Sequence, residues 1–247
     1  MQSINPINYK IRLTPDLEVF RFDASAEILI SPLERTQELA LNILDLAIWS
    51  CKIRSGDNYG ECPCLVDPSK EMLRIFLPHA LDNEFLIRVD YQGRINDKMA
   101  GFYRSGYISG QDTRYIAVTQ FEESDARRAF PCMDHPSQKA TFDIIMDIDS
   151  RLDAISNSAV KKIQELTDGK KRVVFESTPK MSTYLVFFGV GEFEVVQDGK
   201  DPRVRTVTLP GVREHARFGM DFGRKSLQYS ETYYSIPYPL AKMDLIA

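Results

Sequence analysis

Apolar and polar residues alternate along much of the first hundred positions, in short runs that end at turn-forming residues. In the first run, Tyr9, Ile11 and Leu13 alternate with polar positions, which places their side chains on one face of a β-strand. Pro, Gly, Asn and Asp separate the runs, for example in the segment 55–58. Strands that recur this often without helical segments predict a curved antiparallel sheet assembly. The further predicted strands of this part are residues 20–30, 38–44, 48–53, 72–77 and 85–91.

The second half continues this pattern and then changes it. Asp168-Gly169 predicts a tight hairpin turn, and Gly189 and Gly191 predict bulges in a strand pair or bent strand over 181–196. Residues 197–202 are polar and hold both Gly and Pro, which indicates a linker. Beyond it, four aromatic residues recur at spacings of 4, 7 and 4 and favour a helix over 214–235: Phe218, Phe222, Tyr229 and Tyr233. The remaining predicted strands are 114–118, 140–149, 155–158, 161–166, 172–176, 203–209 and 242–247.

These elements predict a mainly β fold in two parts. Residues 1–196 form an all-β domain, a large antiparallel sandwich or saddle. Residues 197–247 carry a strand, a helix and a strand, which indicates the start of an α/β domain. Within the first part, three aspartates alternate with apolar residues in the strand 140–149 and are expected to face solvent: Asp143, Asp147 and Asp149.

Composition and charge exclude several functional classes. The formal net charge of −4 argues against a nucleic-acid partner, which favours a basic surface. The first residues, Met1 to Pro6, have neither the basic nor the apolar segment of a secretion signal. The most apolar stretch, 184–190, is too short to span a membrane. Four cysteines without a secretion signal are typical of reduced thiols, so we expect a cytoplasmic protein without a membrane partner.

Candidate metal ligands do not gather in the sequence. Cys62-Pro-Cys64 is a close pair, but no second pair completes a four-ligand zinc site. No histidine has a second histidine four residues away, as the H-E-x-x-H zinc motif requires: the three are His79, His135 and His215. We therefore predict no metal-binding residues and no catalytic residues in this chain.

The stretch from Thr119 to Pro136 concentrates charge beside aromatic residues. The strand before it delivers Gln120 and Glu122 to a sheet end, where side chains can face a cleft. Ser124 and Asp125 are candidate N-caps of a short helical turn that Pro131 ends. Carboxylates and guanidinium groups beside aromatic rings indicate buried or paired charges. On these residues alone, a structural ion-pair network is favoured over a binding site.

The same stretch resembles the N-terminal-domain signature of the zinc aminopeptidases of the aminopeptidase N family, a group of gluzincins. The resemblance is dense from Gly101 to the end, and the relatives it suggests are archaeal cytosolic enzymes, similar to the tricorn-interacting aminopeptidases, that trim peptides released by larger proteases. It implies that residues 197–247 begin a thermolysin-like catalytic domain and that the chain stops before the zinc motif. Four segments carry it in the family's order: Ala100-Gly-Phe-Tyr-Arg-Ser105, Thr119 to Pro136, Met181 to Phe193, and Ile236 to Ala247.

The resemblance also implies roles for named residues. Glu122 would hold the α-ammonium group of a peptide substrate, and Gln120 would line the pocket for the first side chain. Glu123 is the weaker candidate, because strand alternation would turn it to the opposite side. Arg127 and Arg128 would orient the acidic residues. The full-length protein would then be a zinc-dependent aminopeptidase whose partners are peptides with a free N-terminus and the rest of its own catalytic domain.

A second function remains open at this point. Some members of the family have lost the zinc motif and serve as assembly subunits. A chain with this scaffold could therefore be a non-catalytic β-sandwich module that binds protein partners.

Overall fold

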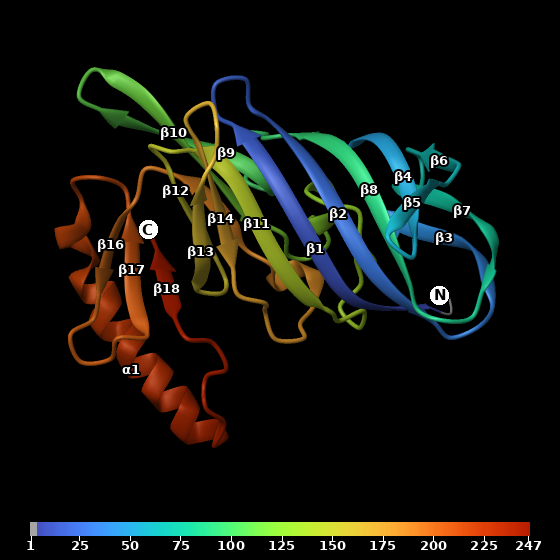
Figure 1. Ribbon diagram of the computed structural model, residues 1–247. Helices are drawn as coiled ribbons and strands as arrows, with labels where there is room; N and C mark the ends of the chain where they lie inside the picture. Colours follow the sequence, from blue (N-terminus) through green and yellow to red (C-terminus); the bar gives the residue numbers. More distant parts are fainter. Residues whose placement is uncertain (1–3) are drawn as a thin grey trace.

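The computed structural model describes residues 4–247, which form two layers of β-structure with a smaller sheet at each end (Figure 1). The larger layer is an eight-stranded sheet in which all neighbours are antiparallel except β1 and β11. Its strands, in spatial order, are β13 (Val160–Glu165), β14 (Lys170–Phe175), β11 (Thr141–Asp149), β1 (Ile4–Asp16), β2 (Arg21–Pro32), β8 (Phe85–Arg94), β4 (Ala47–Ser55) and β5 (Asn58–Glu61).

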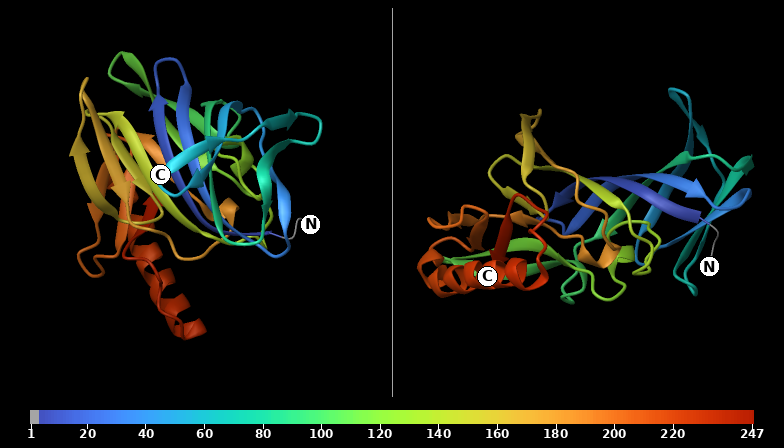
Figure 2. Two further views of the ribbon diagram at one scale, coloured as in Figure 1. Left: turned by 45° about the vertical axis from the view of Figure 1, so that its right-hand side comes forward. Right: turned by 90° about the horizontal axis from the view of Figure 1, so that it is seen from below.

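The second layer is a four-stranded sheet that lies under part of the first (Figure 2, right). Aromatic rings join the two layers: Phe102 contacts Phe22 of the large sheet at 5.4 Å and Phe188 of its own sheet at 5.1 Å between ring centroids. Such edge-to-face pairs stabilise a core by about 0.5–1.5 kcal/mol each beyond the area that they bury. The strands of this layer are β12 (Asp153–Ser156), β15 (Phe188–Gly191), β10 (Asp112–Gln120) and β9 (Gly101–Ser109).

Two three-stranded sheets complete the molecule at opposite ends (Figures 1 and 2). One consists of β3 (Thr36–Asn42), β7 (Met72–Leu81) and β6 (Cys64–Asp67). The other consists of β16 (Glu194–Gln197), β17 (Val204–Thr208) and β18 (Met243–Ile246), and α1 (Arg217–Tyr234) packs on it. The short helical turns are η1 (Ala126–Arg128), η2 (Thr183–Leu185) and η3 (Arg213–Ala216).

The predicted mainly β class is confirmed, and so are the longer strands with one buried face. The Asp168-Gly169 turn is also confirmed: both residues have positive φ, 59° and 69°, and they join β13 to β14. The sequence did not predict three of the strands: β5, β6 and β9. The first two are mostly exposed and show no alternation of apolar residues, while β9 contains two glycines, which disfavour strands.

The predicted strand pair or bent strand over 181–196 is wrong in detail. This segment contains η2 and then β15 and β16, which belong to different sheets. Gly191 is not a bulge but a place of close approach, because a Cβ there would lie 2.4 Å from Cγ2 of Ile116 in β10. The linker predicted at 197–202 is wrong as well, since this segment connects the antiparallel strands β16 and β17. The proposed division of the chain at residue 196 falls inside β16 and stays a prediction.

Helix α1 has one packed face and one exposed face. On the packed face, a Cβ at Gly223 would lie 2.4 Å from Cδ1 of Leu245, so the helix and β18 are in close contact. Leu227 is buried on the same helix. The four aromatic residues predicted to share a face do so and are 62–81% exposed among the residues described: Phe218, Phe222, Tyr229 and Tyr233. No helix in residues 4–247 is long and apolar enough to cross a membrane.

Asp147 of β11 corrects one sequence prediction. Its side chain is 5% exposed, where the alternation pattern had indicated a solvent-facing position. Two arginines from neighbouring strands cover it: the Arg12 Nε donates to its carboxylate at 2.9 Å and the Arg172 Nε at 2.7 Å. Burial alone would raise the pKa of Asp147, but the hydrogen bonds from Arg172 and Arg12 outweigh burial and lower the pKa below its ordinary value.

This pKa shift predicts how acid destabilises the fold. Because the folded-state pKa of Asp147 lies below the unfolded value of about 3.9, the unfolded chain binds the proton first as the pH falls. The stabilisation is therefore fully present above about pH 4 and is lost as the pH falls through the folded-state pKa. We expect the difference in unfolding free energy between the wild type and Asp147→Asn to be constant from about pH 7 to 5 and to shrink below about pH 4. Urea unfolding at each pH measures it, and a difference independent of pH would contradict the assignment.

Candidate functional site

The predicted site residues lie where β10 ends and the chain turns. Gln120 is the last residue of β10, pairs with Gly101 of β9, and is exposed. The next residue, Phe121, is 1% exposed and lies in the core, with its ring centroid 5.9 Å from those of Phe130 and Phe188. Glu122 then begins a turn and is exposed. The buried Phe121 side chain therefore anchors the backbone between the two candidate substrate-binding residues.

The turn that follows is the short helical element that the sequence predicted. It begins after Asp125 and forms η1, and the chain leaves it before Pro131. Asp125 occupies the N-cap position, but its side chain makes no capping hydrogen bond. Instead its carboxylate accepts a hydrogen bond from the Arg128 Nε at 2.8 Å. The Asp125 backbone N–H donates to the Phe121 carbonyl at 2.9 Å and closes the loop that carries Glu122 and Glu123.

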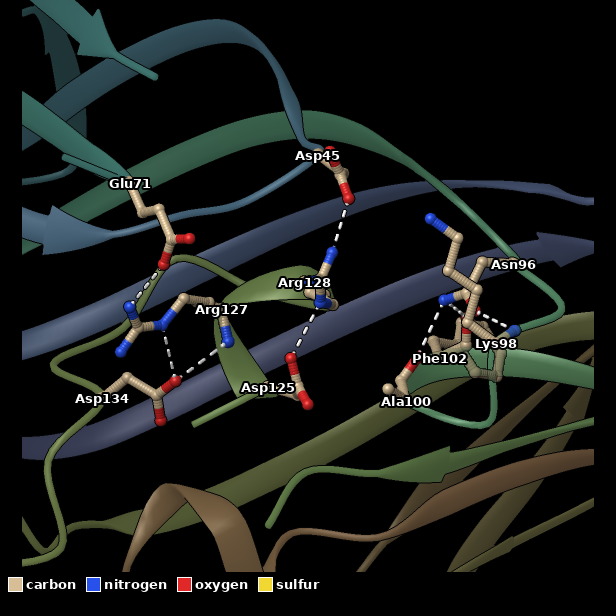
Figure 3. A network of polar contacts seen from close by, with 10 residues as sticks. All are labelled: Asp45, Glu71, Asn96, Lys98, Ala100, Phe102, Asp125, Arg127, Arg128 and Asp134. Carbon is tan, nitrogen blue, oxygen red and sulfur yellow. Dashed lines mark hydrogen bonds and ion pairs between the residues drawn. The ribbon is translucent and has the colours of Figure 1, made fainter. Parts of the chain in front are cut away.

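The two arginines of η1 reach acidic residues that lie far away in the sequence (Figure 3). Arg127 donates to Glu71 at 2.7 Å through Nη1 and to Asp134 at 3.0 Å through Nε. Arg128 donates to Asp45 at 2.6 Å through Nη1. Arg127 and the Asp134 carboxylate are 15% and 1% exposed, so this pair is largely shielded from water. These bonds fix η1 to the connection that follows β3 and to the one that precedes β7.

Buried hydrogen bonds hold the rest of the stretch. The Tyr91 hydroxyl donates to the Ala129 carbonyl at 3.0 Å, and the Met133 backbone N–H donates to the Tyr9 hydroxyl at 3.1 Å. The Thr183 hydroxyl donates to the second Asp134 oxygen at 2.7 Å. Burial raises the pKa of Tyr9 and of Tyr91 well above the ordinary value, so both remain neutral at physiological pH. These hydrogen bonds, together with the ion pairs of η1, hold the backbone from Phe121 to Asp134 in place.

The carboxylates of Glu122 and Glu123 differ from every acidic group around them. Across residues 4–247, no ion pair or hydrogen bond involves either side chain, whereas Asp125 and Asp134 both bind arginine. The prediction that Arg127 and Arg128 orient the acidic residues holds for Asp125 and not for Glu122. The argument from strand alternation for Glu123 does not apply, because both glutamates lie in the turn after the strand.

A free carboxylate on a fixed backbone is suited to bind a cation. Within the described part of the chain, such a carboxylate makes no ion pair or hydrogen bond. Because its backbone is already fixed, little conformational freedom is lost when a ligand binds. A primary ammonium group makes charge-assisted hydrogen bonds to such a carboxylate at about 2.7–2.9 Å. Gln120, the residue before Phe121, adds a side-chain amide that can donate or accept a hydrogen bond.

Three residues of this region were missed as parts of the network: Asp45, Glu71 and Asp134. Asp134 lies inside the charged stretch only seven residues from Arg127, and this proximity was a usable signal. Asp45 and Glu71 come from turns that are 83 and 56 residues away from their arginines. No local pattern in the sequence links such positions.

The fold and this turn together define a mainly β scaffold that presents unpaired carboxylates at a strand end. Residues 5–185 match the family model of the peptidase M1 N-terminal domain, and this chain belongs to that family.

Similar proteins include a puromycin-sensitive aminopeptidase of Caenorhabditis elegans, 38% identical over 98% of this chain, and an aminopeptidase M1-B of Oryza sativa subsp. japonica, 37% identical over 98%. A mitochondrial aminopeptidase 2 of Saccharomyces cerevisiae is 37% identical over 99%. The chain spans 26–28% of the length of these relatives.

Proposed function

We propose that this chain is the N-terminal part of a zinc-dependent aminopeptidase, which removes N-terminal residues from peptides. The chain contributes the β scaffold and part of the clamp that recognises the substrate N-terminus. Its match to the peptidase M1 N-terminal domain and its similarity to proteins named as aminopeptidases support this proposal. The observation that carries it is the exposed and unpaired Glu122 carboxylate on a backbone that Phe121 anchors.

In this proposal Glu122 binds the α-ammonium group of the substrate. An exopeptidase must distinguish a free terminus from the middle of a chain, and a carboxylate makes this distinction because only the free terminus is a cation. Gln120 lines the pocket of the first side chain. The peptide bond to be cleaved would then lie at a fixed distance from Glu122, one residue along the substrate. Glu123, next in the same turn, remains a second carboxylate that can attract the cation.

The zinc ion belongs to the rest of the protein in this proposal. Within residues 4–247, no three side chains of His, Cys, Asp or Glu gather closely enough to hold a metal ion. The histidines do not help, since His135 pairs with the nearby Ser137 and the other two lie elsewhere in the sequence. The residues present therefore do not fit a zinc site, and no chemical step of this chain passes through the metal.

This assignment predicts the behaviour of the isolated chain. Residues 1–247, purified and dialysed, should retain well below one zinc per chain and should hydrolyse no aminoacyl amide, because the H-E-x-x-H ligands are not in the sequence. Metal analysis and an aminoacyl-amide assay measure both properties. One tightly held zinc per chain together with turnover would contradict the proposal.

Three finer features belong to the same proposal. The catalytic domain begins near residue 197, and the sheet of β16, β17 and β18 with α1 is its first part. The protein acts in the cytoplasm, in agreement with four cysteines that are all free. A role like that of the archaeal peptide-trimming enzymes stays a prediction; the relatives reported above are from a nematode, a plant and a yeast.

The alternative is a non-catalytic module that keeps the scaffold and binds protein partners. The exposed aromatic face of α1 favours it, because large exposed apolar patches mark contact surfaces. The coding sequence beyond Ala247 separates the two functions. A G-A-M-E-N segment followed by H-E-x-x-H supports the enzyme, and a continuing reading frame without them supports the module.

A further inference from the structure

A basic cavity lies beside η1, and Arg128 of this turn is part of its lining. It has a volume of about 840 Å³ and is formed by the start of β2, the end of β8, the connection before β4, and residues of β9 and η1. Two aspartates line it, Asp45 and Asp97. Five basic side chains line it as well: Arg21, Arg94, Lys98, Arg104 and Arg128. The cavity is therefore positively charged in a protein whose formal net charge is −4.

Two of these cations are placed against each other. Arg21 and Arg94 are direct cross-strand partners in the antiparallel pair of β2 and β8. Like charges directly opposite each other destabilise a sheet. Neither guanidinium, nor the Lys98 ammonium, has an acidic or hydrogen-bonding partner in the described part of the chain.

Most arginines in residues 4–247 bind a carboxylate. Arg12 and Arg172 share the buried Asp147, and Arg88 binds both Asp90 and Glu27. Arg21 and Arg94 bind none among these residues, and because they lie directly opposite each other on two paired strands, their juxtaposition does not stabilise the fold. An anion from outside the chain would attract both guanidinium groups and so offset the repulsion between them.

The other two arginines of the cavity are already held in place. The Arg104 guanidinium lies over the Phe20 ring at 4.2 Å and donates to the Ile95 carbonyl at 3.2 Å. Arg128 is held between Asp45 and Asp125. Figure 3 shows Arg128 with Asp45 on one side of this region and Lys98 with Asn96 on the other. Side chains that are fixed before binding lose little freedom when a ligand arrives.

We propose that this cavity binds a small multivalent oxyanion, one that carries two or more phosphate or carboxylate groups. The guanidinium fork of arginine matches the geometry of both groups, and several cations in one cavity favour a ligand with more than one negative charge. The two aspartates lie at the rim, with carboxylates 65% and 68% exposed, and leave the unpaired cations available. This cavity would bind an anion, whereas the Glu122 turn is proposed to bind a cation. The proposal therefore does not depend on the proposed peptidase activity.

Calorimetric titration of the chain with tripolyphosphate, at low ionic strength because salt screens such contacts, tests the site. We expect saturable binding at one site, and at least about tenfold weaker binding by Arg21→Gln/Arg94→Gln, which is about 1.4 kcal/mol. A parallel titration with citrate compares carboxylate with phosphate groups. Binding of either anion with this loss supports the proposal, and the ratio of the two affinities says which group the site prefers.

Arg35→Gln is the matched control, because Arg35 is exposed, has no carboxylate partner in residues 4–247 and does not line the cavity. It should bind both anions as the wild type does. Without ligand, the double variant should melt at the wild-type temperature or above it, since the substitutions remove a repulsion. The proposal fails if neither anion binds saturably at millimolar concentrations, or if the double variant binds as tightly as the wild type.

Discussion

Replacing Glu122 by alanine in the complete protein is expected to lower kcat/KM for peptides with a free N-terminus by about 30- to 3,000-fold. The carboxylate would face a substrate cation in a partly desolvated cleft, and truncating one partner of such a pair costs about 2–5 kcal/mol. Each tenfold change in rate corresponds to about 1.4 kcal/mol. Steady-state kinetics on an aminoacyl amide measure the loss, and the melting temperature should not change, because Glu122 has no partner in residues 4–247.

Two controls make this result specific. Glu123→Ala removes the same charge from the same exposed turn and should cost much less activity. N-acetylated peptides have no ammonium group and should lose much less of their already low rate in Glu122→Ala. Equal losses on both kinds of substrate, or equal losses in the two variants, would mean that Glu122 does not hold the substrate terminus.

Replacing Asp134 by alanine is expected to destabilise the fold by about 3–5 kcal/mol. Its carboxylate is 1% exposed and accepts hydrogen bonds from Arg127 and Thr183. Without Asp134, the Arg127 guanidinium keeps only Glu71, whose carboxylate is 39% exposed, and the buried Thr183 hydroxyl loses its acceptor. Removing one partner of a buried ion pair has a measured cost in that range. Urea unfolding of residues 1–247 measures the change in unfolding free energy.

Asp45→Asn is the control for this second experiment, because Asp45 has a φ of 58° that asparagine tolerates and alanine does not. Asp45 pairs with Arg128, the neighbouring arginine, but its carboxylate is 65% exposed. Exposed ion pairs contribute about 0–1 kcal/mol, so this variant should unfold close to the wild type. If both variants lose the same stability, burial of the Arg127–Asp134 pair is not what holds η1 in place.

The sequence predicted those parts of the fold in which one face of a strand is buried. The alternation of Tyr9, Ile11 and Leu13 reports such a face directly, and all three are fully buried in β1. It failed where a side chain is buried for a reason other than hydrophobicity. Asp147 occupies a polar position of the pattern but is buried under Arg12 and Arg172, whose strands lie on either side of β11.

The candidate site was predictable in its chemistry and not in its connections. The strand before Gln120 and the proline at 131 located the turn, because both act locally on the backbone. Charged residues were expected to pair with their neighbours in sequence, and only Asp125 and Arg128 do so. Arg127 and Arg128 also bind carboxylates that are distant in sequence, and the Glu122 carboxylate stays unpaired within residues 4–247.

A crystal structure of the complete protein with a bound peptide tests the central claim most directly. The account predicts that the α-ammonium group lies within about 2.7–2.9 Å of a Glu122 carboxylate oxygen, the distance of a charge-assisted hydrogen bond. Gln120 should lie beside the first side chain of the peptide. A peptide whose ammonium group is held by other residues, with Glu122 directed into solvent, would contradict the account.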